Sequence, residues 1–375
     1  MTKAAELAKM GEVLTNSQIG GRRNIVINGA MQVAQRRTSQ SGITASANEG
    51  YTTVDRFAFD GGTHGGAFTA SQSTDAPTGF SNSLKMECTT ADTSTAAGEL
   101  QMLQTRFEGQ DLQQLKKGTS DAEKVTVSFY VKGNASATYM CELQDSDNGR
   151  TNGQTFAVTT SWNRIVLTFV GDTTGTLDND NALSLRLNFW FNAGSTYTGG
   201  TFTSNQWTTT TNERVGSITN FFDSTDRTFF ITGIQMEIGS QATPFEHRSF
   251  GEELALCQRY YQIVSGTADE VHYLTGALAR YSTNTGMISV QLHKVMRAEP
   301  SMYVLSKDGS PPSDPVGNAQ GNNNNDDFNS GNMTLQQAHD GMATISVGLD
   351  FNPSSSYAHT FYFGSGERLD FDAEL

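Results

Sequence analysis

Cysteines and long apolar runs are scarce in this chain of 375 residues, and each shortage excludes a class of protein. The three cysteines, Cys88, Cys141 and Cys257, are too few and too scattered for a disulfide framework or a zinc site. No apolar run approaches the roughly 20 residues that a membrane helix needs, and no secretory signal peptide opens the chain. We therefore expect a protein that is made in a reducing cytoplasm and does not insert into a membrane.

Basic residues are also in the minority. The chain has 25 Lys and Arg residues against 39 Asp and Glu residues, which gives a net charge of −14. Binding to nucleic acid or to an anionic membrane surface requires clustered Lys and Arg. The charge balance therefore predicts no nucleic-acid partner.

Charged residues make up only 17% of the chain and hydrophobic residues 36%. The remainder is mostly uncharged polar residues and glycine, of which there are 37. This composition is typical of β-proteins with polar outward faces and tight turns. Short alternating segments recur from residue 51 to about 247. In residues 183–191, Leu187 and Phe189 share one face while Asn188 and Trp190 share the other. We predict an all-β fold, with a jelly-roll β-sandwich over residues 51–247.

The stretch 235–262 predicts a junction between two domains. A strand ends near Gly239, and Ser249 with Glu252 three residues later forms a capping box for a hinge helix over residues 248–265. Strand patterns resume after it and predict a second, smaller β-sandwich over residues 266–375. Residues 307–332 have almost nothing to bury, so we expect an exposed loop there.

Residues 1–50 are predicted to form an N-terminal attachment segment that starts with a short helix. Leu7, Met10 and Leu14 share one helical face, and a helix this short needs a partner surface. One interpretation is a peptide that attaches the chain to another protein or a bundle that forms an oligomer, and the other is a tag on its own domain. Arg22 and Arg23 open a basic stretch that either pairs with carboxylates of a neighbouring subunit or is a solvated face.

Three groups of residues resemble tail proteins and tail fibres of tailed bacteriophages. The most specific is ATPFEHRSFGEELALCQRYYQ at residues 242–262, and GRRNIVINGAMQVAQRRT at 21–38 with YTTVDRFAFD at 51–60 resembles the opening of the same family. Residues 100–118, 122–133 and 161–175 fit its carbohydrate-binding-module-like sandwich. The resemblance implies a virion structural protein, with other virion proteins as partners and a homotrimer as the usual assembly.

We expect the protein to be a tail fibre or receptor-binding-type component that is located in the virion and contacts host surface polysaccharide. The alternative is a purely structural virion component, such as a nozzle, tail-tube or capsid-decoration protein. Exposed aromatic rings are the sharpest candidates for glycan contact, and each has core packing as its other explanation. The candidates are Trp190, Trp207, Tyr303 and Tyr357.

We predict no enzymatic activity and no cofactor. The six histidines show no metal-binding spacing, and no nucleophile or phosphate-binding motif is present. The regular repeats of a parallel β-helix, on which tailspike depolymerases are usually built, are also absent. Asp145 with Asp147, and the run 178–181, have the spacing of a calcium loop, but Asp and Asn are also ordinary turn residues. We do not assign a metal site to them.

Overall fold

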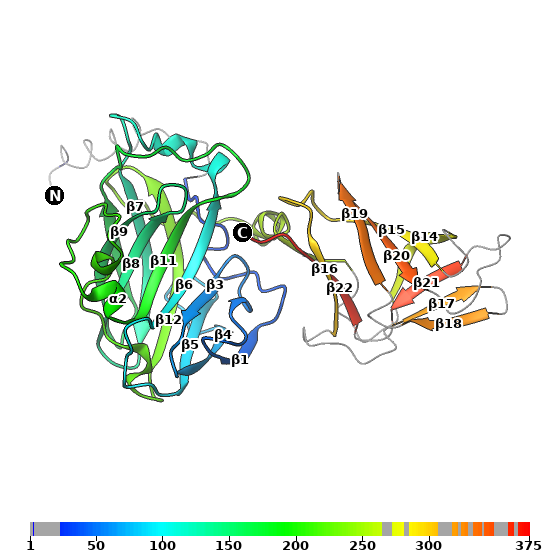
Figure 1. The fold of residues 1–375 in the computed structure, drawn as a ribbon, viewed down its shortest axis with the longest axis horizontal. Coiled ribbons are helices and arrows are strands. Elements are labelled where there is room, and N and C mark those ends of the chain that lie inside the picture. The colour runs from blue at the N-terminus through cyan, green and yellow to red at the C-terminus, as the bar shows by residue number, and fades with distance from the viewer. Residues whose placement is uncertain are drawn as a thin grey trace. The chain divides into compact units, whose positions relative to one another are not determined.

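The computed structural model describes residues 3, 23–264, 272–280, 285–306, 317–321, 324–328, 333–339, 341–348, 359–363 and 367–375. The chain divides into two compact units. The first, which we call the sandwich unit, comprises residues 1–32 and 39–248, and the second, the C-terminal unit, comprises residues 33–38 and 249–375. Their elements are labelled in Figure 1. No helix in the described ranges is long and apolar enough to cross a membrane.

The sandwich unit consists of two six-stranded antiparallel sheets. The first sheet has the order β1 (Ser39–Ile43), β4 (Ala67–Ser73), β5 (Ser83–Thr90), β12 (Thr228–Ile238), β7 (Val125–Gly133) and β10 (Asn163–Phe169). The second sheet has the order β2 (Gly50–Tyr51), β3 (Ala58–Gly62), β6 (Leu100–Glu108), β11 (Leu183–Ala193), β8 (Ala137–Asp145) and β9 (Arg150–Val158). The predicted antiparallel sandwich is confirmed, while its jelly-roll connectivity stays a prediction.

The core lies between the two sheets and is rich in phenylalanine. Phe129 of β7 meets Phe189 of β11 edge to face, with ring centroids 5.1 Å apart. Phe191 of β11 meets Phe229 of β12 in the same way at 4.8 Å. Such pairs add about 0.5–1.5 kcal/mol each beyond the burial of their area. The alternation in β11 therefore predicts its core face correctly, but its polar face is also largely buried.

Short helices lie in the connections between β6 and β7 and between β11 and β12. They are η1 (Gly109–Asp111), η2 (Gln113–Leu115), α2 (Ser195–Thr198), η3 (Thr211–Glu213) and η4 (Phe221–Asp223). The helix predicted inside this unit, over residues 107–117, is two short 3-10 turns; Leu112 between them and Leu115 of the second turn are buried in the core.

The string ATPFEHR closes onto the outward face of β12. Thr243 donates its backbone N–H to the Glu237 carboxylate at 2.8 Å, and the Glu246 N–H donates to the Gln235 side-chain oxygen at 2.8 Å. Glu246 in turn accepts the backbone N–H groups of Arg23 and Asn24, at 2.6 and 2.9 Å. Gln235 and Glu237 are buried for this reason, although they alternate along β12 with the core residues Ile234 and Met236.

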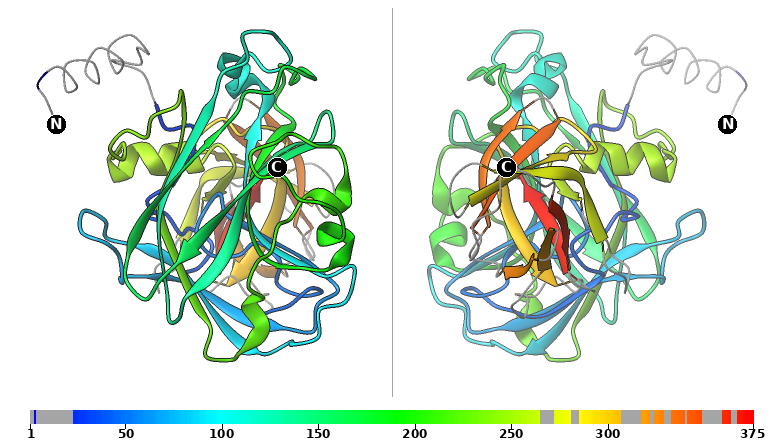
Figure 2. Two further views of the ribbon diagram at one scale, coloured as in Figure 1. Left: turned by 90° about the vertical axis from the view of Figure 1, so that its left-hand side faces the viewer. Right: turned by 90° about the vertical axis from the view of Figure 1, so that its right-hand side faces the viewer.

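The C-terminal unit begins with helix α3 (Phe250–Cys257), which Figure 2 shows side-on. The predicted capping box between Ser249 and Glu252 is present. The helix is shorter than the predicted range 248–265, because the chain turns at Gln258 and enters β13 (Tyr261–Ile263). Tyr261 is buried by the pairing of β13 with β22 and not on a helix face.

Two sheets form the rest of this unit. The three-stranded sheet has the order β13, β22 (Glu367–Asp372) and β16 (Ser301–Ser306). The seven-stranded sheet has the order β18 (Asn324–Phe328), β17 (Gly317–Gly321), β21 (His359–Phe363), β14 (His272–Arg280), β15 (Thr285–Gln291), β20 (Met342–Gly348) and β19 (Met333–His339). Part of the predicted loop 307–332 is thus the hairpin β17–β18, since backbone pairing needs no apolar side chain.

Residues 33–38 form a strap that belongs to the C-terminal unit, although the sequence assigned them to the attachment segment. Arg36 is buried and pairs with Asp372 at 2.9 Å, and its guanidinium lies 3.6 Å from the centre of the Tyr261 ring. Arg368 donates to the backbone oxygen of Arg36 at 2.9 Å and pairs with Asp370 at 2.9 Å. Arg36 therefore pairs with a carboxylate of its own chain and not with one of a neighbouring subunit.

Candidate functional site

The outer face of the second sheet carries a row of side chains that crosses five strands. The strand registers place Tyr51, Ala58, Gln104, Asn188 and Glu142 opposite one another in turn. Their sequence neighbours on β6, β11 and β8 are core residues, so this row points to the other side of the sheet. In Figure 1 four of these strands, β3, β6, β11 and β8, run side by side across the sandwich unit.

Glu142 is the centre of a buried network on this face. Its carboxylate accepts hydrogen bonds from Asn188 Nδ2 at 2.8 Å and Trp190 Nε1 at 3.0 Å. It also receives Arg214 in a two-pronged pair, with distances of 3.0 and 2.8 Å. Burial alone would lower the pKa of Arg214, but the charge and hydrogen bond of Glu142, together with the nearby Tyr197 and Asp60, raise that pKa. Gln144 accepts a further hydrogen bond from Asn188 at 2.9 Å, so these side chains are held in fixed positions.

A second network lies on the neighbouring strands β3 and β6. Gln104 donates to the Asp60 carboxylate at 2.8 Å and accepts from Arg106 at 3.0 Å. The Arg106 guanidinium lies 5.6 Å from the centre of the Tyr51 ring, within reach of a cation–π contact. Tyr51 is half-buried and closes this end of the sheet.

Arg186 stands between the two networks. It lies opposite Arg106 on one side and opposite Gln144 on the other. Its Nε is buried without a hydrogen-bond partner, and no described carboxylate is within ion-pair distance of it. Burial and the charge of Arg106 lower the pKa of the Arg186 guanidinium. We call the half-buried residues Tyr51, Arg106, Gln144 and Arg186, together with the fully buried Gln104 that holds Arg106, the polar shelf.

The segment 194–218 covers the apolar end of the same face. Trp190 packs there with Met102, Met140 and Val215 in a separate small core, and Tyr197 lies 5.3 Å from it between ring centres. Trp190 is fully buried, so this predicted glycan contact presents no ring to solvent. Trp190 is buried because the segment 194–218 covers it, and the strand pattern of the sequence alone does not place that segment.

The other predicted aromatic contacts are dispersed. Trp207 is half-buried against the main core, and its Nε1 donates to the Val170 backbone oxygen at 2.9 Å. Tyr303 is 48% exposed on β16 of the C-terminal unit. None of these residues belongs to the polar shelf. Tyr357 lies outside the described residues, as do the predicted anchoring residues Leu7, Met10, Leu14 and Arg22. The fifth predicted anchor, Arg23, lies within the described residues, and its backbone N–H donates a hydrogen bond to the Glu246 carboxylate.

A lysine occupies the place where the sequence suggested calcium. Lys117 Nζ pairs with Asp145 at 2.5 Å and Asp172 at 3.2 Å, and it donates to the backbone oxygens of Thr174 and Gly175 at 3.0 and 2.9 Å. The Lys117 ammonium, surrounded by two carboxylates and two carbonyl oxygens, supplies the positive charge that a metal ion would otherwise supply. Within the described residues no group of three metal-ligating side chains comes together.

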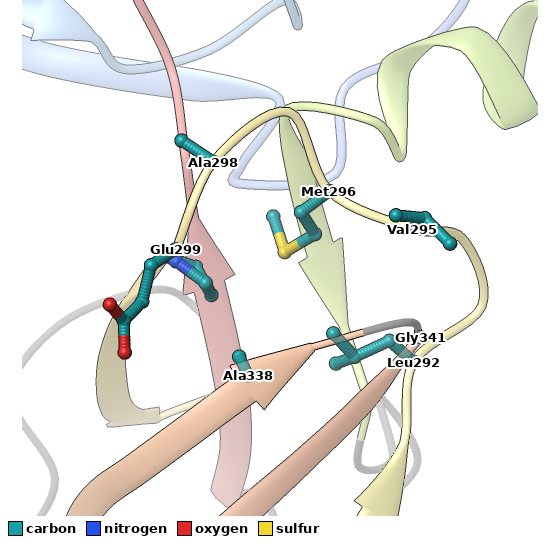
Figure 3. A pocket seen from close by; sticks show the side chains of 8 residues that line it. Leu292, Val295, Met296, Ala298, Glu299, Ala338 and Gly341 are labelled. Atoms are coloured by element: carbon teal, nitrogen blue, oxygen red, sulfur yellow. The ribbon is translucent and has the colours of Figure 1, made fainter.

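One apolar pocket lies in the C-terminal unit and has a volume of about 210 Å³. Leu292, Val295 and Met296 form much of its lining (Figure 3). Glu299 is its one acidic side chain, and Figure 3 shows the carboxylate turned away from Met296. An apolar lining of this kind lacks the convergent polar groups that a sugar site needs.

Comparison with known proteins gives only distant likenesses. No family model matches the sequence, and no curated protein matches it. The fold is similar to a structure described as CBM4, with 11% identity and a TM-score of 0.30, over 56% of this chain and 97% of that one. It is similar to a Clostridium thermocellum family 11 carbohydrate-binding module, with 12% identity and a TM-score of 0.27, over 55% and 99%.

A third likeness is to the enzymatically active domain of bacteriophage CBA120 tailspike protein 4. The identity is 12% and the TM-score 0.29, over 57% of this chain and 21% of that one. TM-scores this low carry no argument about function.

Proposed function

We propose that this protein is a virion protein of a tailed bacteriophage, of the tail-fibre or receptor-binding type, and that its sandwich unit binds a host surface glycan. The observation that carries the glycan part is the polar shelf. Gln144 is half-buried and held by Asn188, while Arg106 is held by the buried Gln104 and lies beside the ring of Tyr51. Planar amide and guanidinium groups pair well with sugar hydroxyls, and their fixed positions reduce the entropy lost on binding.

The sequence resemblance of residues 21–38, 51–60 and 242–262 supports the phage part of the proposal. On this account the protein is made in the bacterial cytoplasm, attaches to the virion through its N-terminal segment and assembles as a homotrimer. Several copies would bind a cell surface through avidity even where one shelf binds weakly. On this proposal the protein acts by binding rather than by catalysis. The carboxylates of Glu142 and Asp60 on this face agree with that, because they already accept hydrogen bonds from neighbouring side chains.

A purely structural virion component is the second candidate. The observation that favours it is the dense pairing around Glu142, because a satisfied buried network also suits a domain that acts as a spacer. On this account the polar shelf would contact no glycan.

The test is binding of the full-length protein to susceptible host cells, with the mass of the assembly measured on the same sample. A Tyr51→Ala/Gln144→Ala double variant changes the polar shelf, and Val166→Ala, 47% exposed on β10 of the other sheet, is the matched control. We expect saturable binding that the double variant weakens about tenfold, a loss of about 1.4 kcal/mol, while the control keeps it.

A Tyr303→Ala variant tests the C-terminal unit in the same assay. Loss of binding in this variant alone would move the glycan contact away from the polar shelf. A folded oligomer that binds no host cells would leave the structural component as the better proposal.

A further inference from the structure

We propose that the glycan held by the polar shelf is anionic, and that Arg186 together with Arg106 binds its acidic group. This inference rests on the proposed function and narrows its ligand to acidic polysaccharides, such as those built from uronic acids. Three observations on the second sheet support it.

The first observation is the placement of two like charges. Arg106 on β6 and Arg186 on β11 are directly opposite in the register, where like charges repel and destabilise a sheet. The described carboxylates on this face are already engaged, Asp60 by Gln104, Glu108 by Gln110 and Glu142 by Arg214. An anion between the two guanidinium groups would relieve the repulsion.

The second observation is unused hydrogen-bonding capacity at neighbouring positions of one strand face. Arg186 Nε is a buried donor without a partner, and Asn188 Oδ1, two residues later on β11, is a buried acceptor without a partner. A guanidinium binds a carboxylate through two parallel hydrogen bonds, and an amide oxygen accepts from a hydroxyl. A sugar acid carries both groups close together on one ring.

The third observation is the contrast with three other arginines that are withdrawn from solvent. Arg36, Arg214 and Arg368 have side chains that are 8%, 15% and 3% exposed, and each pairs with a carboxylate of this chain. Arg186 is half-buried and lacks such a pair. Burial and the charge of Arg106 also lower the pKa of Arg186, and the charge of Asp60 only partly offsets them. The chain as a whole carries a charge of −14, so attraction of an acidic polymer must come from a local site.

The experiment measures binding of the full-length protein to three polymers and to host cells. The polymers are polygalacturonate, the same polymer after reduction of its carboxyl groups, and dextran sulfate. Arg186→Gln is compared with Lys124→Gln, which removes the same charge from an exposed side chain. A charge-assisted hydrogen bond predicts that Arg186→Gln weakens binding to polygalacturonate by about tenfold or more. Lys124→Gln should bind as the wild type does, and circular dichroism confirms that both variants fold.

The outcomes separate the two proposals. Preference for polygalacturonate over its reduced form, lost in Arg186→Gln, supports a carboxylate ligand. Equal, Arg186-dependent binding of dextran sulfate supports an anionic ligand of either chemistry. In a third outcome, Tyr51→Ala/Gln144→Ala weakens host-cell binding and Arg186→Gln leaves it unchanged. This result would overturn the proposal of an anionic ligand, while the proposal of glycan binding would stand. A wild-type protein that binds neither cells nor polymers would overturn both.

Discussion

Replacement of Lys117 by methionine tests the account of the sandwich most severely. Methionine keeps most of the length of the side chain and removes only the ammonium group. In the wild type that group is 5% exposed, while its partners Asp145 and Asp172 are 0% and 3% exposed. Without it, two buried carboxylates lie close together with one fewer counter-charge.

The magnitude follows from what the two aspartates keep. Removal of one partner from a buried ion pair costs about 3–5 kcal/mol. Asp172 retains Arg150 at 2.7 Å, and Asp145 retains hydrogen bonds from Asn148, so we expect the lower end, about 3 kcal/mol. For a unit of this size that lowers the melting temperature by about 6–12 °C.

Differential scanning calorimetry of the full chain measures this shift. Lys116→Met is the matched control, because the neighbouring Lys116 is exposed and should leave the transition nearly unchanged. Calcium should restore part of the lost stability in Lys117→Ala, since two carboxylates and two carbonyls would then face an open cation-sized space, and it should not affect the wild type. A Lys117→Met protein that melts with the wild type would refute our reading of this lysine as an essential counter-charge.

Two further predictions concern other buried charges. Burial, helped by the nearby charge of Asp60, raises the pKa of Glu49 to about 7 from 4.5, although a backbone hydrogen bond from Gly61 opposes it. The folded state therefore holds that proton more tightly, and stability present below pH 4.5 is lost as the pH rises to about 7. Glu49→Gln should remove this loss in urea denaturation at both ends of the window, and an unchanged pH dependence would contradict the assignment. In the C-terminal unit, Arg36→Met should destabilise by about 3 kcal/mol, since Asp372 loses its buried partner and Tyr261 its stacked cation. Guanidinium denaturation measures this, and a loss below about 1 kcal/mol would mean that the strap contributes little.

The sequence predicts those features that depend on local pattern. Alternation in β7 and β11 identifies the core face, and the pair Ser249 and Glu252 identifies the start of α3, because both signals involve residues close together in the chain. The end of α3 is predicted too late, since Tyr261 is buried by strand pairing rather than by a helix face.

The polar shelf could not be predicted in the same way. Arg186, Asn188 and Trp190 alternate on one strand face, and that pattern was visible in the sequence. Whether such a face is open or covered depends on the segment 194–218, which hides Trp190 and leaves Arg186 half-exposed. The partners Arg106 and Gln144 come from other strands, and only the register brings them together.

A crystal structure of the full-length protein with an oligosaccharide from the host surface would test the central claim most directly. Our account predicts electron density for the sugar against Tyr51, Gln144 and Arg186, with an acidic group between Arg186 and Arg106. Sugar density on the C-terminal unit around Tyr303, with an empty polar shelf, would contradict it.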